Sequence, residues 1–470
     1  MIEQHQVTIA TAVFLITYAV IVSEKVHRAV AAFCGAALVV LVGILEPERA
    51  VHAIDWNTIG LLVGMMIIVG ITRETGVFEF LAIKAAKAAK GQPLAIMASL
   101  AAVTAVLSAF LDNVTTVLLV VPVTFAIAKK LEINPLPFII AEILSSNIGG
   151  TATLIGDPPN IMIGSATHLG FLDFMINLTP IVVLVHVMTV FILQLIYRKS
   201  LRVPAEVRSR IFEFNEYDEL KDMALLKKCL IVITLVVAGF LLHQVLHLES
   251  CVIALSGASL LLLITRAEPE HPLHQVEWPV IFFFIGLFVV VGALEEVGVI
   301  RMLAELALEA TGGVIIPTGM LILWISAIAS AFVDNIPFVA TMIPLIKEMA
   351  ALGNMAAYDV DFLWWSLSLG ACLGGNGTII GASANVVVIG MSEKRGLVIT
   401  FIEFMKVAFP LMLMSIILST GYMFLWYVLP TTPTILATLG VACMVGVILV
   451  LAGRRLVAAE EALAQQSRTA

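Results

Sequence analysis

The sequence predicts an all-α polytopic membrane protein built from two inverted-topology repeats. Three observations lead to this fold class: a very apolar composition, many apolar runs long enough to cross a bilayer, and an ordered set of internal matches. Of the 470 residues, 60% are hydrophobic and 13% are charged, against roughly 25% charged in an average soluble domain. This composition leaves too little polar side chain to cover a globule. It therefore excludes a soluble enzyme and a nucleic-acid-binding protein.

Apolar runs give the expected membrane spans, because a helix needs about 20 apolar residues to cross the hydrocarbon layer. The expected spans lie near residues 6–23, 29–46, 57–73, 136–167, 173–197, 229–246, 250–265, 278–295, 362–392, 404–429 and 433–453. Two further apolar stretches, 93–131 and 315–350, are each interrupted by an Asp-Asn pair. The alternating pattern of a β-barrel is absent, so we expect a helical bundle.

Lysine and arginine residues predict the orientation of these spans. With the N-terminus outside, 23 of the 26 basic residues fall in cytoplasmic segments, including Lys25, Arg28 and eight residues of the polar segment 198–228. The basic residues left outside are Arg49, Arg301 and Lys347. The positive-inside rule then predicts a multi-pass inner-membrane protein with its N-terminus outside and its C-terminus in the cytoplasm.

An internal duplication follows from three matches in the same order. Asp55-Trp56 matches Glu277-Trp278, and Phe110–Val114 matches Phe332–Ile336, both 222 positions apart. The stretch 149–160 matches 374–385, 225 positions apart. Each half carries five crossings, an odd number, so the second copy is inverted. We expect a first repeat over 1–198, a cytoplasmic linker over 199–228, a second repeat over 229–430, and an extra span with a cytoplasmic tail over 431–470.

The Asp-Asn pairs interrupt the two apolar stretches at matching places. Intramembrane carboxylates are costly and are functional candidates by default. Each stretch could form two full spans with a solvated turn, and the charge rule does not separate this geometry from a re-entrant hairpin. The shared signature favours re-entrant hairpins, with Asp112-Asn113 and Asp334-Asn335 at their tips.

Glycines and prolines break two further helices, because proline lacks an N–H and glycine is flexible. Unwound backbone at this depth needs protein or a cavity to satisfy it. The substrate-binding candidates at the four breaks are Asn113, Thr115, Asn147, Gly150, Thr151, Thr153, Gly156, Asn160, Asn335, Asn376, Thr378, Gly381, Ser383 and Asn385. The candidates for proton or cation coupling are Asp112, Asp157 and Asp334. The four polar elements contain no Lys or Arg, which suits a proton, a sodium ion or a neutral polar solute.

The motifs FLDNVTT, SNIGGTATLIGDPPN, FVDNIP and GGNGTIIGASAN resemble those of the ArsB/NhaD permease family of the ion transporter superfamily. The resemblance extends from about residue 10 to residue 430. It implies an inverted-repeat transporter with two re-entrant hairpins, two unwound helices and an elevator-like or rocking movement of the site. The family includes arsenite/antimonite permeases, sodium/proton antiporters and P protein-like transporters. The DNVTT and IGDPPN motifs look closer to the last two branches.

The leading functional hypothesis is arsenite/antimonite efflux coupled to proton antiport. Arsenite is a neutral trihydroxy solute at physiological pH, so amide and hydroxyl groups can bind it without a fixed cation. Sodium/proton antiport, cation-coupled anion transport and a channel-like pore remain alternatives. The expected partners are a small-molecule or ion substrate and the lipid bilayer; a homodimer and a separate ATPase subunit stay open. No enzyme activity, cofactor, metal or nucleic-acid partner is expected.

Overall fold

The computed structural model describes residues 2–23, 25–201, 203–266, 268–429, 432 and 434–446. Over these residues the protein is helical, and ten of the described helices are long and apolar enough to cross a membrane. The predicted all-α membrane fold with inverted repeats is confirmed. The expected span near 433–453 is described only by a short apolar helix, Thr434–Gly446. The remainder of that span and the predicted tail lie outside the described residues.

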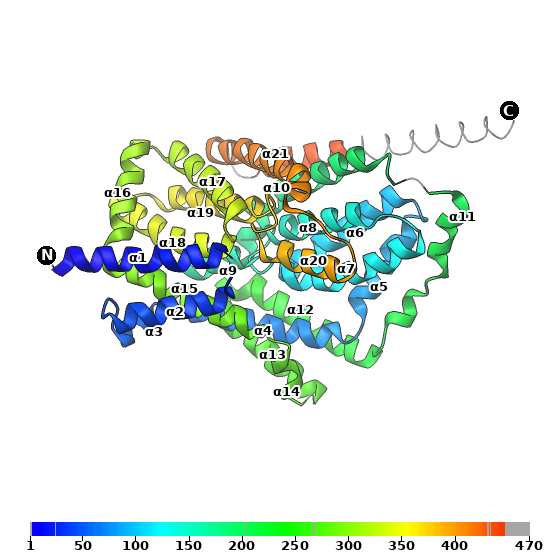
Figure 1. Ribbon diagram of the computed structural model, residues 1–470, viewed down its shortest axis with the longest axis horizontal. Helices are drawn as coiled ribbons and strands as arrows, with labels where there is room; N and C mark the ends of the chain where they lie inside the picture. The colour runs from blue at the N-terminus through cyan, green and yellow to red at the C-terminus, as the bar shows by residue number, and fades with distance from the viewer. Residues whose placement is uncertain are drawn as a thin grey trace.

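The two repeats contain the same elements in the same order (Figure 1). The first comprises α1 (Ile2–Ser23), α2 (Arg28–Leu41), α3 (Pro47–His52), α4 (Trp56–Arg73), α5 (Val77–Ala88), α6 (Pro93–Phe110), α7 (Asn113–Lys130), α8 (Leu136–Gly150), α9 (Pro158–Ala166) and α10 (Phe171–Tyr197). The second comprises α12 (Met223–Leu246), α13 (Ser250–Thr265), α14 (Glu270–His274), α15 (Trp278–Glu296), α16 (Val299–Thr311), α17 (Ile315–Phe332), α18 (Asn335–Leu352), α19 (Ala357–Gly374), α20 (Ser383–Lys394) and α21 (Phe401–Val428). Thus α1–α10 correspond one by one to α12–α21.

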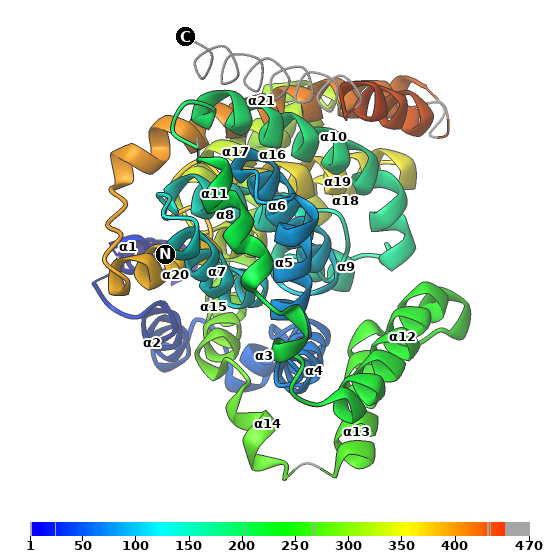
Figure 2. The same cartoon turned by 90° about the vertical axis from the view of Figure 1, so that its right-hand side faces the viewer.

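The repeats exchange helices with each other. Helix α2 packs against α15, and its counterpart α13 packs against α4. The same exchange occurs at the two breaks, where α9 packs against α18 and α20 packs against α7. Figure 2 shows α2, α4, α12, α13 and α15 on one side of the molecule, with α6, α8, α10, α17, α19 and α21 on the other. Neither repeat therefore forms its half of the central region alone.

The hairpins α6–α7 and α17–α18 lie in opposite halves of the molecule in Figure 1. Their tips nevertheless line one central cavity, which is bordered by Asp112 and Asn113 from one tip and by Asn335 and Ile336 from the other. Two turns at opposite membrane faces would be about 30 Å apart. The hairpins are therefore re-entrant, as the shared Asp-Asn signature predicts.

Two short helices, α5 and α16, precede the hairpins and were not among the expected spans. Each follows a glycine in the left-handed region, Gly76 and Gly298, with φ of +76° in both. These glycines are 222 positions apart, the same offset as the hairpin motifs. A residue with a side chain is strained at this φ, so glycine is required at both turns.

The linker is fastened to the first repeat. It contains α11 (Ala205–Arg208) and two 3₁₀ helices, η1 (Ser209–Glu213) and η2 (Glu216–Glu219). Lys87 of α5 forms an ion pair with Glu216, and Lys130 of α7 lies 2.5 Å from Glu213. The backbone N–H of Lys221 also donates to the Thr75 carbonyl at 3.0 Å. The segment therefore docks on the ends of α5 and α7.

Candidate functional site

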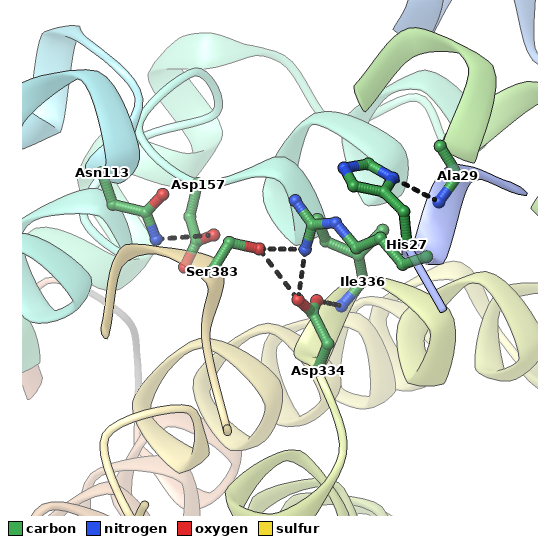
Figure 3. A network of polar contacts seen from close by, with 8 residues as sticks. His27, Ala29, Asn113, Asp157, Asp334, Ile336 and Ser383 are labelled. Atoms are coloured by element: carbon green, nitrogen blue, oxygen red, sulfur yellow. Dashed lines mark hydrogen bonds and ion pairs between the residues drawn. The ribbon is translucent and has the colours of Figure 1, made fainter. Parts of the chain in front are cut away.

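The central cavity lies between the two hairpin tips and the first turns of α9 and α20. Its polar lining combines Arg28, Asp112, Asn113, Asp157, Glu277, Asn335 and Ser383. Its volume is about 20 Å³, on a measure by which one water molecule needs roughly 10 to 15 Å³. In this conformation the cavity therefore has room for a water-sized group or a small ion. Figure 3 shows Asn113, Asp157, Ser383 and Asp334 close to one another.

Six asparagines are predicted at the breaks, and four of them form one buried amide network. Asn147 of α8 donates to Asn376 and Asn385 of the second repeat, both at 2.9 Å, and accepts from Asn113 at 3.0 Å. All four side chains are buried. Asn335, the symmetry counterpart of Asn113, is also buried, but its Nδ2 has no hydrogen-bond partner in the described part of the chain. The fold therefore brings together amides predicted separately in the two halves.

The remaining asparagine, Asn160, and its counterpart Asn385 hold the unwound backbone. Asn160 donates to the carbonyls of Thr151 (3.1 Å) and Thr153 (2.9 Å). Asn385 donates to the carbonyls of Gly375 and Thr378, both at 2.8 Å. An unpaired buried carbonyl costs free energy comparable to a lost hydrogen bond. These amides therefore make the breaks possible within a buried region.

The predicted threonines are also used within the protein. Thr153 donates to the carbonyl of Ala109, and Thr378 donates to that of Ala331. Thr151 donates to the Asn147 carbonyl at 2.8 Å. The first two bonds tie each unwound segment to the hairpin helix beside it, whereas the Thr151 bond closes the end of α8.

The glycines at the breaks permit close contact between backbones. A Cβ on Gly156 would lie 2.5 Å from the Ser108 carbonyl oxygen, and one on Gly381 would lie 2.7 Å from that of Ser330. A Cβ on Gly150 would lie 2.5 Å from the Gly156 carbonyl oxygen. None of the three has a positive φ. Their role in this structure is packing, and contact with substrate stays a prediction.

The three predicted carboxylates make different hydrogen bonds in the structure. Asp112 caps α7 by accepting from the Thr115 N–H at 2.9 Å and from its hydroxyl, and Asp334 caps α18 by accepting from the Ile336 N–H at 3.1 Å. Asp157, the third coupling candidate, makes no capping bond. It accepts from Asn113 at 3.3 Å through Oδ1, while its buried Oδ2 has no hydrogen-bond partner in the described residues. Of the three predicted carboxylates, Asp157 is thus the one with an unpaired oxygen.

Two charged residues of the site were missed by sequence reasoning. Arg28, placed in a cytoplasmic connection, instead lies in the cavity wall with its Nη1 2.7 Å from Asp334 Oδ2. Glu277 was noted only as part of a repeat match and also lines the cavity. The two hairpin tips and the two unwound segments contain no Lys or Arg, as predicted, but α2 contributes Arg28 to the site. The sequence signal was the position of Arg28 at the first residue of an apolar helix.

Comparison with known proteins places this architecture in a family. A family model described as citrate transporter, CitMHS, matches residues 18–370, three quarters of the chain. The chain belongs to this family. An uncharacterized transporter of Mycobacterium tuberculosis, Rv2684, is 45% identical over 89% of this chain and 98% of that protein. The human P protein is 34% identical over 90% of this chain and 60% of that protein. The predicted membership of the ion transporter superfamily is confirmed.

Solved structures share the fold. The YdaH transporter of Alcanivorax borkumensis superposes with a TM-score of 0.56, at 13% identity, over 90% of this chain and 98% of that one. MtrF of Neisseria gonorrhoeae gives 0.55, at 12% identity, over 84% and 85%. At such identity the likeness shows the fold alone. Family and fold together make the protein a multi-pass secondary transporter.

Proposed function

We propose that this transporter exports arsenite or antimonite in exchange for protons. The observation that supports this function is the excess of hydrogen-bond acceptors in the cavity. Asp112, Asp157 and Glu277 line it without an ion-pair partner in the described part of the chain, and its one arginine is paired with Asp334. Such a site favours a ligand that donates hydrogen bonds or carries positive charge. A bare multivalent anion would meet repulsion.

The two unpaired polar groups of the cavity match such a solute. The Oδ2 of Asp157 can only accept a hydrogen bond while ionised, and the Nδ2 of Asn335 can only donate. A neutral trihydroxy solute can donate one O–H to Asp157 and accept from Asn335. Protonation of Asp157 makes that oxygen a donor and weakens it as an acceptor. Proton and solute therefore compete for one carboxylate, and this competition makes the transport an exchange.

Sodium/proton antiport is the second candidate, and the size of the cavity favours it. About 20 Å³ suits a sodium ion or a water-sized group in this conformation, whereas arsenite requires the hairpin tips to separate. Neither exchange requires an ATPase subunit or a second copy of the chain, because the ion gradient supplies the free energy. Both fit an inner-membrane protein with its N-terminus outside.

Transport in everted membrane vesicles separates the candidates. Arsenite, sodium and citrate are supplied in turn under an imposed pH gradient, with vesicles lacking the protein as the control. Arsenite uptake that collapses when an ionophore removes the gradient supports the first proposal. Sodium-dependent dissipation of the gradient without arsenite movement replaces it with the second. Citrate uptake without arsenite uptake and without sodium-dependent dissipation of the gradient contradicts both proposals.

A further inference from the structure

Arg28 has an environment built for a guanidinium group. Its Nη1 donates to Asp334 Oδ2 at 2.7 Å and also to the Ser383 hydroxyl. The guanidinium carbon lies 5.1 Å from the centre of the Phe283 ring, a cation–π contact. Ser383 in turn donates to Asp334 at 2.8 Å, as Figure 3 shows. The arginine is therefore held by a carboxylate, a hydroxyl and an aromatic face.

The end of α1, which precedes Arg28 in the chain, also contacts the second hairpin. Tyr18, near the end of α1, donates its hydroxyl to the Pro337 carbonyl at 2.6 Å, within the first turn of α18. Only 26% of the Arg28 side chain and 11% of the Asp334 side chain are exposed. The end of α1 and the start of α2 thus hold a fixed, largely buried positive charge at the tip of the second hairpin.

The two-fold symmetry of the repeats shows what is unusual about this charge. The 222-residue offset relates Asp334 to Asp112 and Arg28 to Ser250, which begins α13 as Arg28 begins α2. The position of Ser383 is occupied by Pro158 in the first repeat, at the 225-residue offset. Asp112 is bonded by Thr115 and has no cationic partner among the described residues. The two halves of the site therefore differ by a tethered cation, Arg28, in the second half and by a free carboxylate, Asp157, in the first, where the second half has Ala382.

We propose that Arg28 is a built-in counter-ion that occupies the cation position at the α17–α18 tip, so that transported or coupling cations bind only in the first-repeat half. A buried carboxylate needs a compensating charge, and an arginine remains protonated at any physiological pH. Because Arg28 is covalently part of α2, it cannot be carried across. The inference rests on the proposed function and adds the number of cations that accompany each transport cycle.

The primary test counts protonated carboxyl groups by infrared absorption of purified protein in sodium-free buffer at neutral pH, and needs no cargo. In Arg28→Gln, Asp334 loses its counter-ion and takes up a proton, so one additional carboxylic-acid band per molecule is expected. Arg28→Gln/Asp334→Asn should return to the wild-type number. The matched control is Arg49→Gln, which removes an arginine from an exposed ion pair with Glu296. An unchanged band number in folded Arg28→Gln overturns the proposal.

A second variant covers the case in which Arg28→Gln does not fold. If Arg28 keeps Asp334 ionised in the wild type, Asp334→Asn removes no carboxylic-acid band. Loss of a band in that variant contradicts the proposal. Failure of the wild type to move arsenite would refute the proposed function without affecting either infrared result.

The transport consequence is measured by the reversal potential in proteoliposomes, with arsenite or sodium, whichever the wild type carries. Arg28→Gln should couple one more proton per cycle than the wild type, and Arg28→Gln/Asp334→Asn should couple the wild-type number. An arginine with a purely structural role would lower the rate and leave the stoichiometry unchanged, which would overturn the proposal.

Discussion

Asn147 in α8 donates a 2.9 Å hydrogen bond to Asn385 in α20, a residue 238 positions later in the chain. This bond joins the two unwound helices directly, because Asn385 also holds the broken backbone of its own repeat. The amide network therefore connects the two repeats at the centre of the protein through side-chain hydrogen bonds. Its integrity should govern both the stability and the activity of the transporter.

Replacement of Asn147 by leucine should destabilise the protein and abolish transport. The change leaves buried groups of Asn113, Asn376 and Asn385 without their partner, and each such group costs about 1 to 3 kcal/mol. Thermal unfolding in detergent should show a clearly lower midpoint. Asn134→Ala, in an exposed turn, serves as the control and should unfold like the wild type. A wild-type midpoint for Asn147→Leu would show that the network contributes little.

Enlarging a glycine at either break should disrupt the site through the backbone. Gly156→Ala places a methyl group 2.5 Å from the Ser108 carbonyl oxygen, and overpacking of this kind costs about 1 to 3 kcal/mol. Gly381→Ala should behave alike, and leucine at either position should abolish transport. Gly421→Ala in α21 is the control, since a Cβ there meets nothing within 4 Å. Normal flux in both site variants would contradict the packing role.

Asp157→Asn should abolish both solute exchange and gradient-driven accumulation, because proton and solute share this carboxylate in the proposed mechanism. The amide keeps the shape but neither titrates nor offers the same acceptor. Uptake with and without a pH gradient measures the two activities in one preparation. Asp359→Asn, in which the amide oxygen can still accept from the Tyr427 hydroxyl, is the control. Preserved accumulation in Asp157→Asn would place the coupling proton on another group.

The predicted orientation can be measured by cysteine labelling. In a background without the five native cysteines, cysteines near Glu48 and near Lys347 should react with an impermeant reagent in intact cells. A cysteine near Arg208 should react only after the membrane is opened. The expectation rests on the division of basic residues, 22 to 3 once Arg28 is counted in the cavity wall. Labelling of the Arg208 site in intact cells would reverse the assigned orientation.

Docking of the linker should weaken in acid. Lys87 donates a hydrogen bond to Glu216 and holds the pKa of that carboxyl below its usual value. A lowered pKa means that ionised Glu216 stabilises docking above its ordinary pKa, and that this contribution is lost as the pH falls through the lowered value. Glu216→Gln should therefore speed hydrogen exchange of the linker at neutral pH but not in strong acid. The control is Glu206→Gln, and equal exchange rates at neutral pH would contradict the prediction.

The sequence by itself determined the architecture. Apolar runs of bilayer length establish the spans, and the 222-residue offset establishes the duplication. Gly-Gly pairs locate both broken helices, with a Pro-Pro pair at the first. These features are local or periodic in the chain, so elementary rules recover them. The same rules found Asp112, Asp157 and Asp334, because a carboxylate inside an apolar stretch stands out wherever it lies.

Only the tertiary structure decided how these groups are used. Arg28 meets Asp334 across 306 positions, Glu277 enters the cavity, and Asp157 rather than the hairpin carboxylates keeps a free oxygen. Each outcome depends on which helix of one repeat packs against which helix of the other. A charge beside an apolar run appears the same in sequence whether its helix ends at the membrane surface or at the centre of the protein. The packing of helices from one repeat against the other decides between these two positions, and it brings Arg28 into the site.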